Sequence, residues 1–226
     1  MPPHLSGQCG SQEFRWELTH AGLPALTEEP RPWAALHEAG VITEPSSKPW
    51  SDGVRRPGRA PALPREKNEP LHTFEPGGFD QYLILDAGEM TTAFPEVEVE
   101  GPEGAEIRLR YAEALSENLK KGRRDEKASG DVEGYFDCYR LRAGRQVYEP
   151  FHWRAFRFLK IVLKPCEKPV RLHRVRMRRC TYPGEVSARL EAPIARLQEL
   201  IEVSWRTVQL CSHDTQDDCP YYEQLP

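Results

Sequence analysis

The fourteen residues 213–226 hold the side chains of this sequence that are best suited to chemistry. They combine two adjacent tyrosines, Tyr221 and Tyr222, with four carboxylates: Asp214, Asp217, Asp218 and Glu223. Carboxylates can serve as acid, as base and as acceptors for hydroxyl groups, and flat aromatic rings stack on the faces of sugars. The stretch is therefore typical of a site that cleaves a glycosidic bond, and the elements before it must position it.

Length and charge limit the class of protein to which this site can belong. The 226 residues suffice for one large domain or two small ones, each with its own core. The net charge of -4 gives no general attraction for nucleic acid. Residues 1–6 lack the basic and apolar regions of a signal peptide, and no apolar run approaches the ~20 residues of a membrane helix. We therefore expect a cytoplasmic protein that binds neither nucleic acid nor membranes.

The cysteines and arginines suggest no further site. The six cysteines are scattered and form no Cys-X-X-Cys pair, so they are expected to stay reduced. Cys211, His213 and Cys219 follow no common zinc spacing, and we expect no metal and no cofactor. A basic run lies near the end of the predicted strands, and no aromatic residues alternate with it, as they would in a nucleic-acid site. We expect this run to pair with acidic side chains. This run comprises Arg171, Arg174, Arg176, Arg178 and Arg179.

Residues 1–78 are rich in proline and show little periodicity. They predict an irregular arm, or the remnant of an upstream domain. Within this part, Ala34–Glu38 could form a short helical piece that Gly40 would end. The Gly-, Pro- and Arg-rich residues 51–61 have the composition of a linker.

From residue 79 to residue 182 the apolar pattern has a period of two. Residues 82–85 are apolar on both faces, as in a buried strand, whereas residues 96–100 and 106–111 alternate so that one face is buried and the other faces water, which is typical of antiparallel sheets. The pattern places Ile107, Leu109 and Tyr111 inside, and Glu106, Arg108 and Arg110 outside. Expected strands cover residues 82–85, 96–100, 106–111, 135–139, 147–148, 156–163 and 170–177, with a long loop at 116–131. About seven or eight short strands predict an antiparallel β-sandwich, most simply a jelly roll.

After Pro183-Gly184 the apolar residues change to helical spacing. The stripe comprises Ile194, Leu197, Leu200, Ile201, Trp205 and Val208. Pro193 suits the first turn of this helix, which should end near Cys211. The acidic stretch then follows the C-terminal end of the helix.

The motifs from residue 79 to the end resemble the α-L-rhamnosidases of glycoside hydrolase family 78. Trp205–Thr207, Gln209–Cys211, His213–Thr215 and Asp218–Leu225 look like the segment where the catalytic helical barrel of that family begins. Asp86–Glu89, Gly104–Ile107, Tyr111–Leu115, Lys121–Arg124 and Phe151–Arg157 look like the β-sandwich before it. The Asp-Cys-Pro…Glu motif is the most specific part. The pattern departs at Pro226, where the family continues toward a Gly-Asp pair.

The resemblance implies roles for four residues of the acidic stretch. It implies an inverting enzyme with an (α/α)₆ barrel, in which Glu223 is the general acid and Asp218 grips sugar hydroxyls. Asp214 and Tyr222 are further substrate-binding candidates. The sequence by itself also allows Glu223 to be a solvated loop residue and Asp218 to be a turn or capping residue. His213 is expected to be structural.

The resulting expectation is an N-terminal fragment of an enzyme that removes terminal α-L-rhamnose from glycosides or polysaccharides. Residues 183–226 would be the start of a truncated barrel, and the chain would be inactive because it lacks the general base. Its helix would expose an apolar stripe and could cause self-association. The alternative is a non-catalytic β-sandwich module that binds carbohydrate or a protein. Exposed tryptophans or tyrosines on one sheet face would favour this alternative, although we expect Trp153, Phe156 and Phe158 to be core residues.

Overall fold

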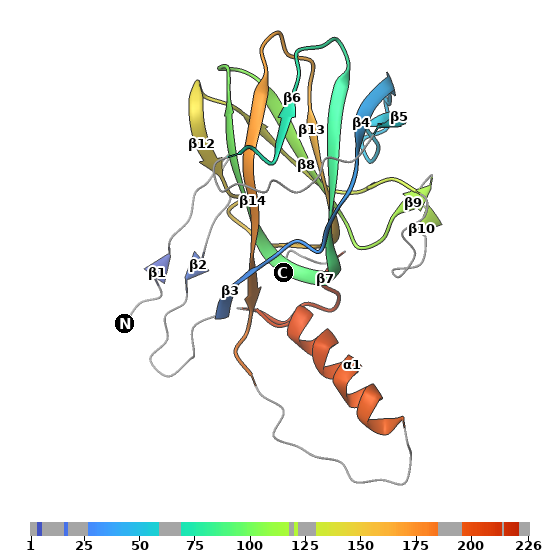
Figure 1. Ribbon diagram of the computed structural model, residues 1–226. Helices are drawn as coiled ribbons and strands as arrows, with labels where there is room; N and C mark the ends of the chain where they lie inside the picture. The colour runs from blue at the N-terminus through green and yellow to red at the C-terminus, as the bar shows by residue number, and fades with distance from the viewer. Residues whose placement is uncertain are drawn as a thin grey trace.

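Figure 1 shows the computed structural model, a β-rich body with helix α1 extending from its lower end. The structure describes residues 4–5, 16–17, 27–58, 69–117, 120–121, 130–184, 196–213 and 215–221. The strands are β1 (His4–Leu5), β2 (Trp16–Glu17), β3 (Thr27–Arg31), β4 (Ala35–Pro45), β5 (Gly53–Gly58), β6 (His72–Phe74), β7 (Asp80–Gly101), β8 (Glu106–Ala112), β9 (Ser116–Glu117), β10 (Lys120–Lys121), β11 (Phe136–Arg140), β12 (Gly144–Tyr148), β13 (Arg154–Leu163) and β14 (Val170–Thr181). The helix α1 spans Leu197–Leu210.

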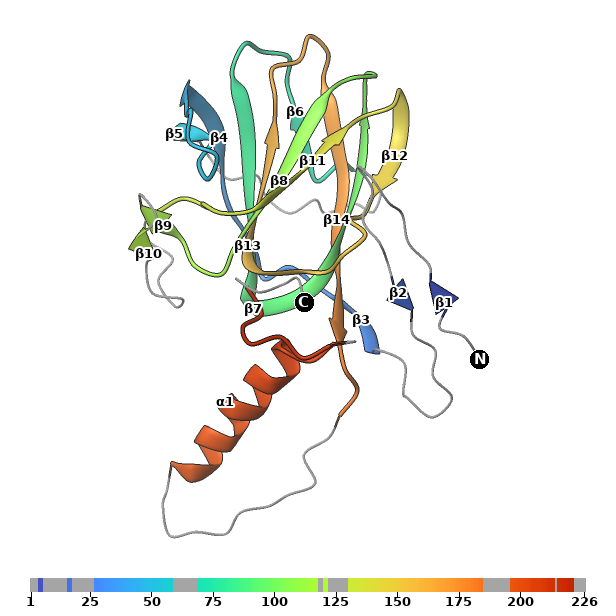
Figure 2. The ribbon, with the colours of Figure 1, turned by 180° about the vertical axis from the view of Figure 1, so that it is seen from behind.

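Ten of the strands, β3 to β8 and β11 to β14, hydrogen-bond into one antiparallel sheet that folds over itself. The sheet bends along β7, whose 22 residues cover two strands expected from the sequence, 82–85 and 96–100. The first layer contains β4 and β13, which pair with the first half of β7, and β13 continues to Ala93. The second layer contains β12 and β14, which pair with residues 93–101 of β7. β5, β8 and β11 extend the first layer, and β3 and β6 extend the second. The predicted antiparallel sandwich is therefore confirmed (Figures 1 and 2).

The core lies between the two layers and contains the residues that the period-two pattern placed inside. Ile107, Leu109 and Tyr111 are at most 1% exposed, and Phe156 belongs to the same cluster. Two smaller clusters bury Phe158 and Trp153, so all three rings expected to be core residues are buried. Burying an apolar side chain contributes about 1.5–3 kcal/mol, which makes these clusters the main source of stability.

Arg110 contradicts the predicted alternation on β8. Glu106 and Arg108 lie partly exposed, as expected, but Arg110 is only 1% exposed. Its guanidinium donates to Asp52 and to the backbone carbonyls of Pro49 and Gly134, whose segments cover this end of the outer face. The sequence pattern could not show that loops would cover a face that most of the strand presents to water.

The N-terminal part of the chain supplies strands to both layers. The helix expected at Ala34–Glu38 is wrong, because β4 runs through it and pairs with β7 on one side and β5 on the other. Tertiary pairing and the β-branched residues 41–43 outweigh the local helix propensity. Gly40 ends no helix. A Cβ there would lie 2.3 Å from the Arg56 carbonyl oxygen, so this glycine allows β4 and β5 to approach closely. Part of the expected linker forms β5, Gly53–Gly58.

Two other expectations concern the surface of the sandwich. The basic run on β14 pairs with acids, as predicted: the ion pairs are Arg171–Glu100, Arg174–Glu98, Arg176–Glu96 and Arg178–Glu149. Such exposed pairs contribute little to stability. The loop expected at 116–131 includes the short antiparallel pair β9 and β10, and its residues 122–129 lie outside the described residues.

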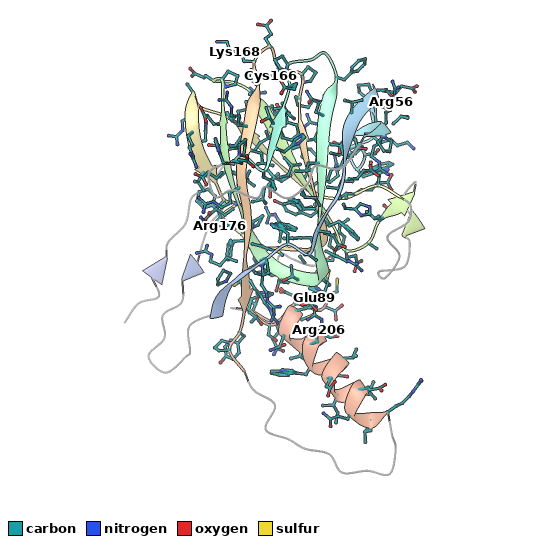
Figure 3. The ribbon with its side chains drawn as sticks, viewed as in Figure 1. Arg56, Glu89, Cys166, Lys168, Arg176 and Arg206 are labelled. Atoms are coloured by element: carbon teal, nitrogen blue, oxygen red, sulfur yellow. The ribbon has the colours of Figure 1, made fainter. Side chains whose placement is uncertain are left out.

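Helix α1 is attached to a bulge in β7. Arg206 contacts the Glu89 carboxylate at 3.1 Å and donates to the Met90 carbonyl at 2.5 Å (Figure 3). At the end of the helix, Thr181 donates to the Gln209 carbonyl at 2.8 Å. The helix agrees with the expected range, although Pro193 lies outside the described residues. Within those residues, no helix has the length and hydrophobicity needed to span a lipid bilayer.

Candidate functional site

The structure places one of the four predicted site residues. Asp218 is exposed, in the segment that follows α1. Asp214, Tyr222 and Glu223 lie outside the described residues. The roles inferred for all four therefore stay predictions, and the geometry that can be described is that of the segment which leads to Glu223.

His213 anchors the start of this segment on the sandwich. Its ring stacks on the Trp153 ring with 3.8 Å between the centroids and 14° between the planes. Its backbone N–H donates to the Thr215 carbonyl at 2.9 Å, which folds the segment back on itself. Its Nδ1 lies 3.2 Å from Oδ2 of Asp217, and both side chains are 3% exposed. His213 therefore has the structural surroundings that the sequence analysis expected.

The His213–Asp217 contact joins two neutral groups near pH 5. Burial, together with the neighbouring His152, lowers the pKa of His213 to about 4. Burial also raises the pKa of Asp217 to about 6. Between these values the Asp217 carboxylic acid donates to Nδ1, and above pH 6 the N–H tautomer of His213 donates to the carboxylate. The hydrogen bond is thus retained on either side of this titration.

Tyr221 anchors the end of the segment, two positions before Glu223. Its hydroxyl donates to the Tyr111 carbonyl at 2.8 Å, and its ring is buried with Phe94 and Trp153. The hydroxyl passes beside Gly134, where a Cβ would lie 2.3 Å from it. Gly134 also has φ +142°, a conformation that favours glycine. The backbone of this position is therefore shaped to admit the tyrosine.

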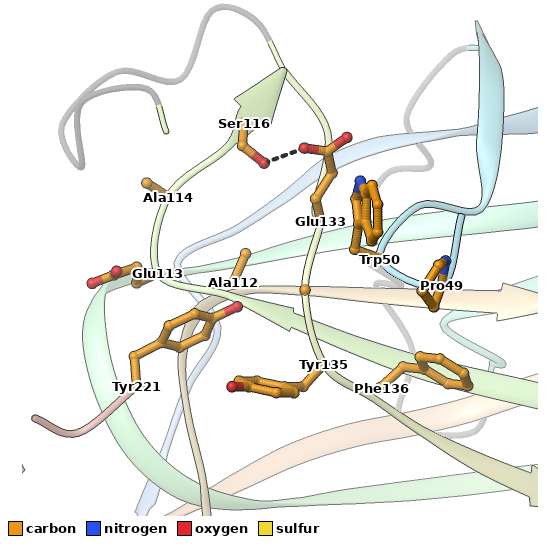
Figure 4. A pocket seen from close by; sticks show the side chains of 11 residues that line it. Pro49, Trp50, Ala112, Glu113, Ala114, Ser116, Glu133, Tyr135, Phe136 and Tyr221 are labelled. Atoms are coloured by element: carbon orange, nitrogen blue, oxygen red, sulfur yellow. Dashed lines mark hydrogen bonds between the residues drawn. The ribbon is translucent and has the colours of Figure 1, made fainter. Parts of the chain in front are cut away.

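A cavity of about 450 Å³ opens beside Tyr221 (Figure 4). Segments far apart in the sequence form its wall: Pro49, Trp50, Ala112, Glu113, Ala114, Ser116, Glu133, Gly134, Tyr135, Phe136 and Tyr221. The sequence analysis identified Tyr221 as part of a chemical site but missed Trp50, Glu133 and Tyr135. Glu133 and Tyr135, two positions apart, were the available signal, since Trp50 lay in the part expected to be irregular.

Arg110 holds the two loops of this wall together. Its guanidinium donates to both carboxylate oxygens of Asp52, at 3.1 and 2.9 Å. It also donates to the Pro49 carbonyl at 3.2 Å and to the Gly134 carbonyl at 2.6 Å. The bidentate pair is buried, and buried charges of this kind are retained only where every donor has a partner. The wall is therefore a preformed part of the fold.

A second cation, Lys160, lies under the same wall. Its Nζ is 3.2 Å from Asp52 and 2.9 Å from Asp131. Burial would raise the pKa of Asp52, but Lys160 and Arg110 outweigh it and hold that pKa below its ordinary value. These charges are matched within the fold and support the cavity from below. Within the described residues, no group of three or more His, Cys, Asp or Glu side chains could hold a metal ion.

Comparison with known proteins identifies relatives of the sandwich. Residues 79–178 match the family model of the bacterial α-L-rhamnosidase concanavalin-like domain. The GH78 family rhamnosidase of Bacillus sp. GL1 is 29% identical with a TM-score of 0.57, over 76% of this chain and 18% of that one. A rhamnosidase from Klebsiella oxytoca with rhamnose bound shares the fold, at 14% identity and a TM-score of 0.59, over 89% of this chain and 38% of that one.

The chain thus spans 18% and 38% of the length of these two solved relatives. No curated protein matches the chain.

Proposed function

Because residues 79–178 match the family model of the bacterial α-L-rhamnosidase concanavalin-like domain, we propose that this chain serves an inverting α-L-rhamnosidase. The substrates would be glycosides or polysaccharides with terminal α-L-rhamnose. The observation that carries the proposal is the segment after α1, which is anchored on this domain at Trp153 and Tyr111 and leads directly to Glu223.

Four residues of the segment have roles in this proposal. Glu223 protonates the leaving oxygen as general acid, while Asp218, Asp214 and Tyr222 bind the rhamnose. An exposed carboxylate such as Asp218 can accept hydrogen bonds from two neighbouring hydroxyls. Asp217 is unsuited to either role, because it is buried against His213.

Inversion needs a second carboxylate that activates water from the opposite face of the sugar. In inverting enzymes the two carboxyl groups lie roughly 6.5–9.5 Å apart, on either side of the substrate. One short segment cannot surround the sugar in this way, so the base belongs to a helical barrel outside these 226 residues. We therefore propose that the 226-residue chain is a fragment that is inactive by itself.

A hybrid enzyme tests the catalytic role. Residues 79–226 would replace the corresponding part of the Bacillus sp. GL1 rhamnosidase, and hydrolysis of an aryl α-L-rhamnoside would be followed by absorbance. We expect activity, with β-L-rhamnose as the first product by NMR, and a loss of about 10²–10⁴-fold in Glu223→Gln. Glu202→Gln, which alters an exposed glutamate of α1, is the control and should keep full activity.

A folded, active hybrid that is indifferent to Glu223→Gln would refute the role of Glu223. A first product with retained configuration would refute the inverting mechanism. For the unmodified 226-residue chain, turnover above that of its own Glu223→Gln variant would refute the proposal that it is inactive.

A further inference from the structure

The cavity beside Tyr221 has a lining that the proposed catalytic roles do not use. Tyr135 is 55% exposed, and its ring centroid lies 5.9 Å from that of Tyr221. Figure 4 shows Tyr135 and Tyr221 along one side of the cavity, with Trp50 and Glu133 across from them. Large exposed rings cost free energy in water, so a cavity that keeps them suits a ligand with a flat apolar face.

The charged groups of the wall are carboxylates, which accept hydrogen bonds. Ser116 donates to Oε2 of Glu133 at 2.9 Å, which fixes the direction of that carboxylate. A carboxylate has about four lone-pair positions, so Glu133 can also accept from ligand hydroxyls. Glu113 contributes to the same wall, and the described lining contains no lysine or arginine. The wall therefore suits an uncharged ligand rich in hydroxyl groups and disfavours an anion.

The size and construction of the cavity fit one class of ligand. About 450 Å³ lies within the ~300–1,000 Å³ range of small-molecule sites. Arg110 fixes the loops of Trp50 and Gly134 in place, and Asp52 neutralises its charge. Little ordering is then needed when a ligand enters, which favours binding.

We propose that this cavity is a carbohydrate-binding site for an uncharged pyranose residue. The sugar stacks between Trp50 and Tyr135, and its hydroxyls donate to Glu133. The site lies beside Tyr221. Its lining residues are other than those given roles in the proposed reaction, and it does not depend on that reaction.

Titration calorimetry and saturation-transfer NMR on the 226-residue chain test this site. The probes are methyl α-L-rhamnopyranoside, methyl β-D-glucopyranoside and methyl β-D-glucuronoside. We expect the two uncharged probes to bind with dissociation constants on the order of 1 mM, as suits ligands of this size, and the glucuronoside at least about fivefold more weakly. Trp50→Ala and Tyr135→Ala should each weaken binding about tenfold, whereas Tyr135→Phe keeps the ring and should bind normally.

Two controls separate the cavity from the rest of the surface. Phe79→Ala removes another exposed ring, 56% accessible, and should leave binding unchanged. Glu133→Gln should weaken the uncharged probes and reduce the discrimination against the glucuronoside, because a neutral acceptor replaces the charge. Folding of every variant is checked by its thermal transition.

Three results would overturn the proposal. The first is no binding of either uncharged probe at tens of millimolar. The second is binding that survives both Trp50→Ala and Tyr135→Ala in folded protein, which would place the sugar elsewhere. The third is a glucuronoside that binds as tightly as the uncharged sugars. None of these results concerns the hybrid enzyme, so failure here and failure of the catalytic proposal are distinguishable.

Discussion

Lys160→Met removes one of three cations from a buried cluster that also holds three carboxylates. The cluster links Arg110 to Asp52, Lys160 to Asp52 and Asp131, and Arg55 to Asp131 and Glu38. Lys160 is fully buried, and methionine preserves its length without its charge. The variant leaves one excess negative charge in a site from which water is excluded.

Breaking a buried ion pair by removing one partner costs about 3–5 kcal/mol, because the other charge stays buried. We expect a loss of this size, a large share of the ~5–15 kcal/mol that stabilises a typical domain. For a protein of this length, each kcal/mol lowers the melting temperature by about 2–4 °C. The expected decrease is therefore about 6–20 °C at pH 7.

The loss should depend on pH because Lys160 helps to lower the pKa of Asp52, against the effect of burial. The folded-state pKa lies below the unfolded value of about 3.9, so this carboxylate stabilises the fold above about pH 5. That contribution disappears as the pH falls through the folded-state pKa. Without Lys160, ionised Asp52 contributes less to stability at neutral pH. The variant therefore has less to lose on acidification, and the stabilities of the two proteins should converge as the pH falls.

Urea unfolding at pH 7 and at about pH 3, below the unfolded-state pKa of Asp52, measures both effects when followed by circular dichroism. Lys168→Met, at an exposed loop position labelled in Figure 3, is the control and should change stability by less than about 0.5 kcal/mol. Adding Asp52→Asn to Lys160→Met restores the charge balance and should recover part of the loss. A loss below about 1 kcal/mol, or an equal loss at both pH values, would refute this account of the cluster.

Three further predictions concern the segment after α1 and its contacts. Asp217→Asn should stabilise the protein more at pH 8 than at pH 5, by about 1 kcal/mol. The folded-state pKa of about 6 exceeds the unfolded value of about 3.9, so the wild-type fold loses stability as the pH rises from about 4 to above 6, and asparagine removes this loss. Denaturation at both pH values measures the difference. Gly134→Ala should cost about 1–3 kcal/mol in thermal unfolding, through its positive φ and its contact with the Tyr221 hydroxyl, and no loss would contradict this. The exposed Leu200 and Val208 of α1 should cause self-association that Leu200→Glu with Val208→Glu suppresses, as light scattering would show; a concentration-independent monomer would contradict it.

The sandwich could be predicted where the sequence alternates strictly. Ile107, Leu109 and Tyr111 fall at every second position, and a strand places such residues on one face wherever its partners are. The pattern could not show that β7 is one strand, because residues 87–90, of which Gly88 and Glu89 are exposed, form a bulge that interrupts the alternation. It also misplaced Ala35–Glu38, whose state is set by pairing with β7 and not by local preference.

The two candidate sites also differ in how far the sequence could predict them. The acidic segment was found from sequence because its carboxylates and tyrosines are neighbours in the chain. The cavity was not found, because Trp50 and Tyr135 come together only through the bonds of Arg110 to two distant loops. Arg110 itself occupies an outward position on β8, where charge is ordinarily solvated. Nothing local distinguishes it from Arg108.

Strand β7 also determines how the sandwich can open. Because its two halves belong to different layers, its backbone bonds join those layers into one network. Neither layer can separate without disturbing a strand that the other layer also uses. We therefore expect the amide hydrogens of β7, β13 and β14 to exchange with solvent through a single cooperative opening. The strand passes from one layer to the other just after the bulge at 87–90, at Ala93, which pairs with both β13 and β14. Arg206 of α1 contacts the bulge at Glu89 and Met90. A movement of α1 would therefore displace the part of β7 next to the point where the two layers join.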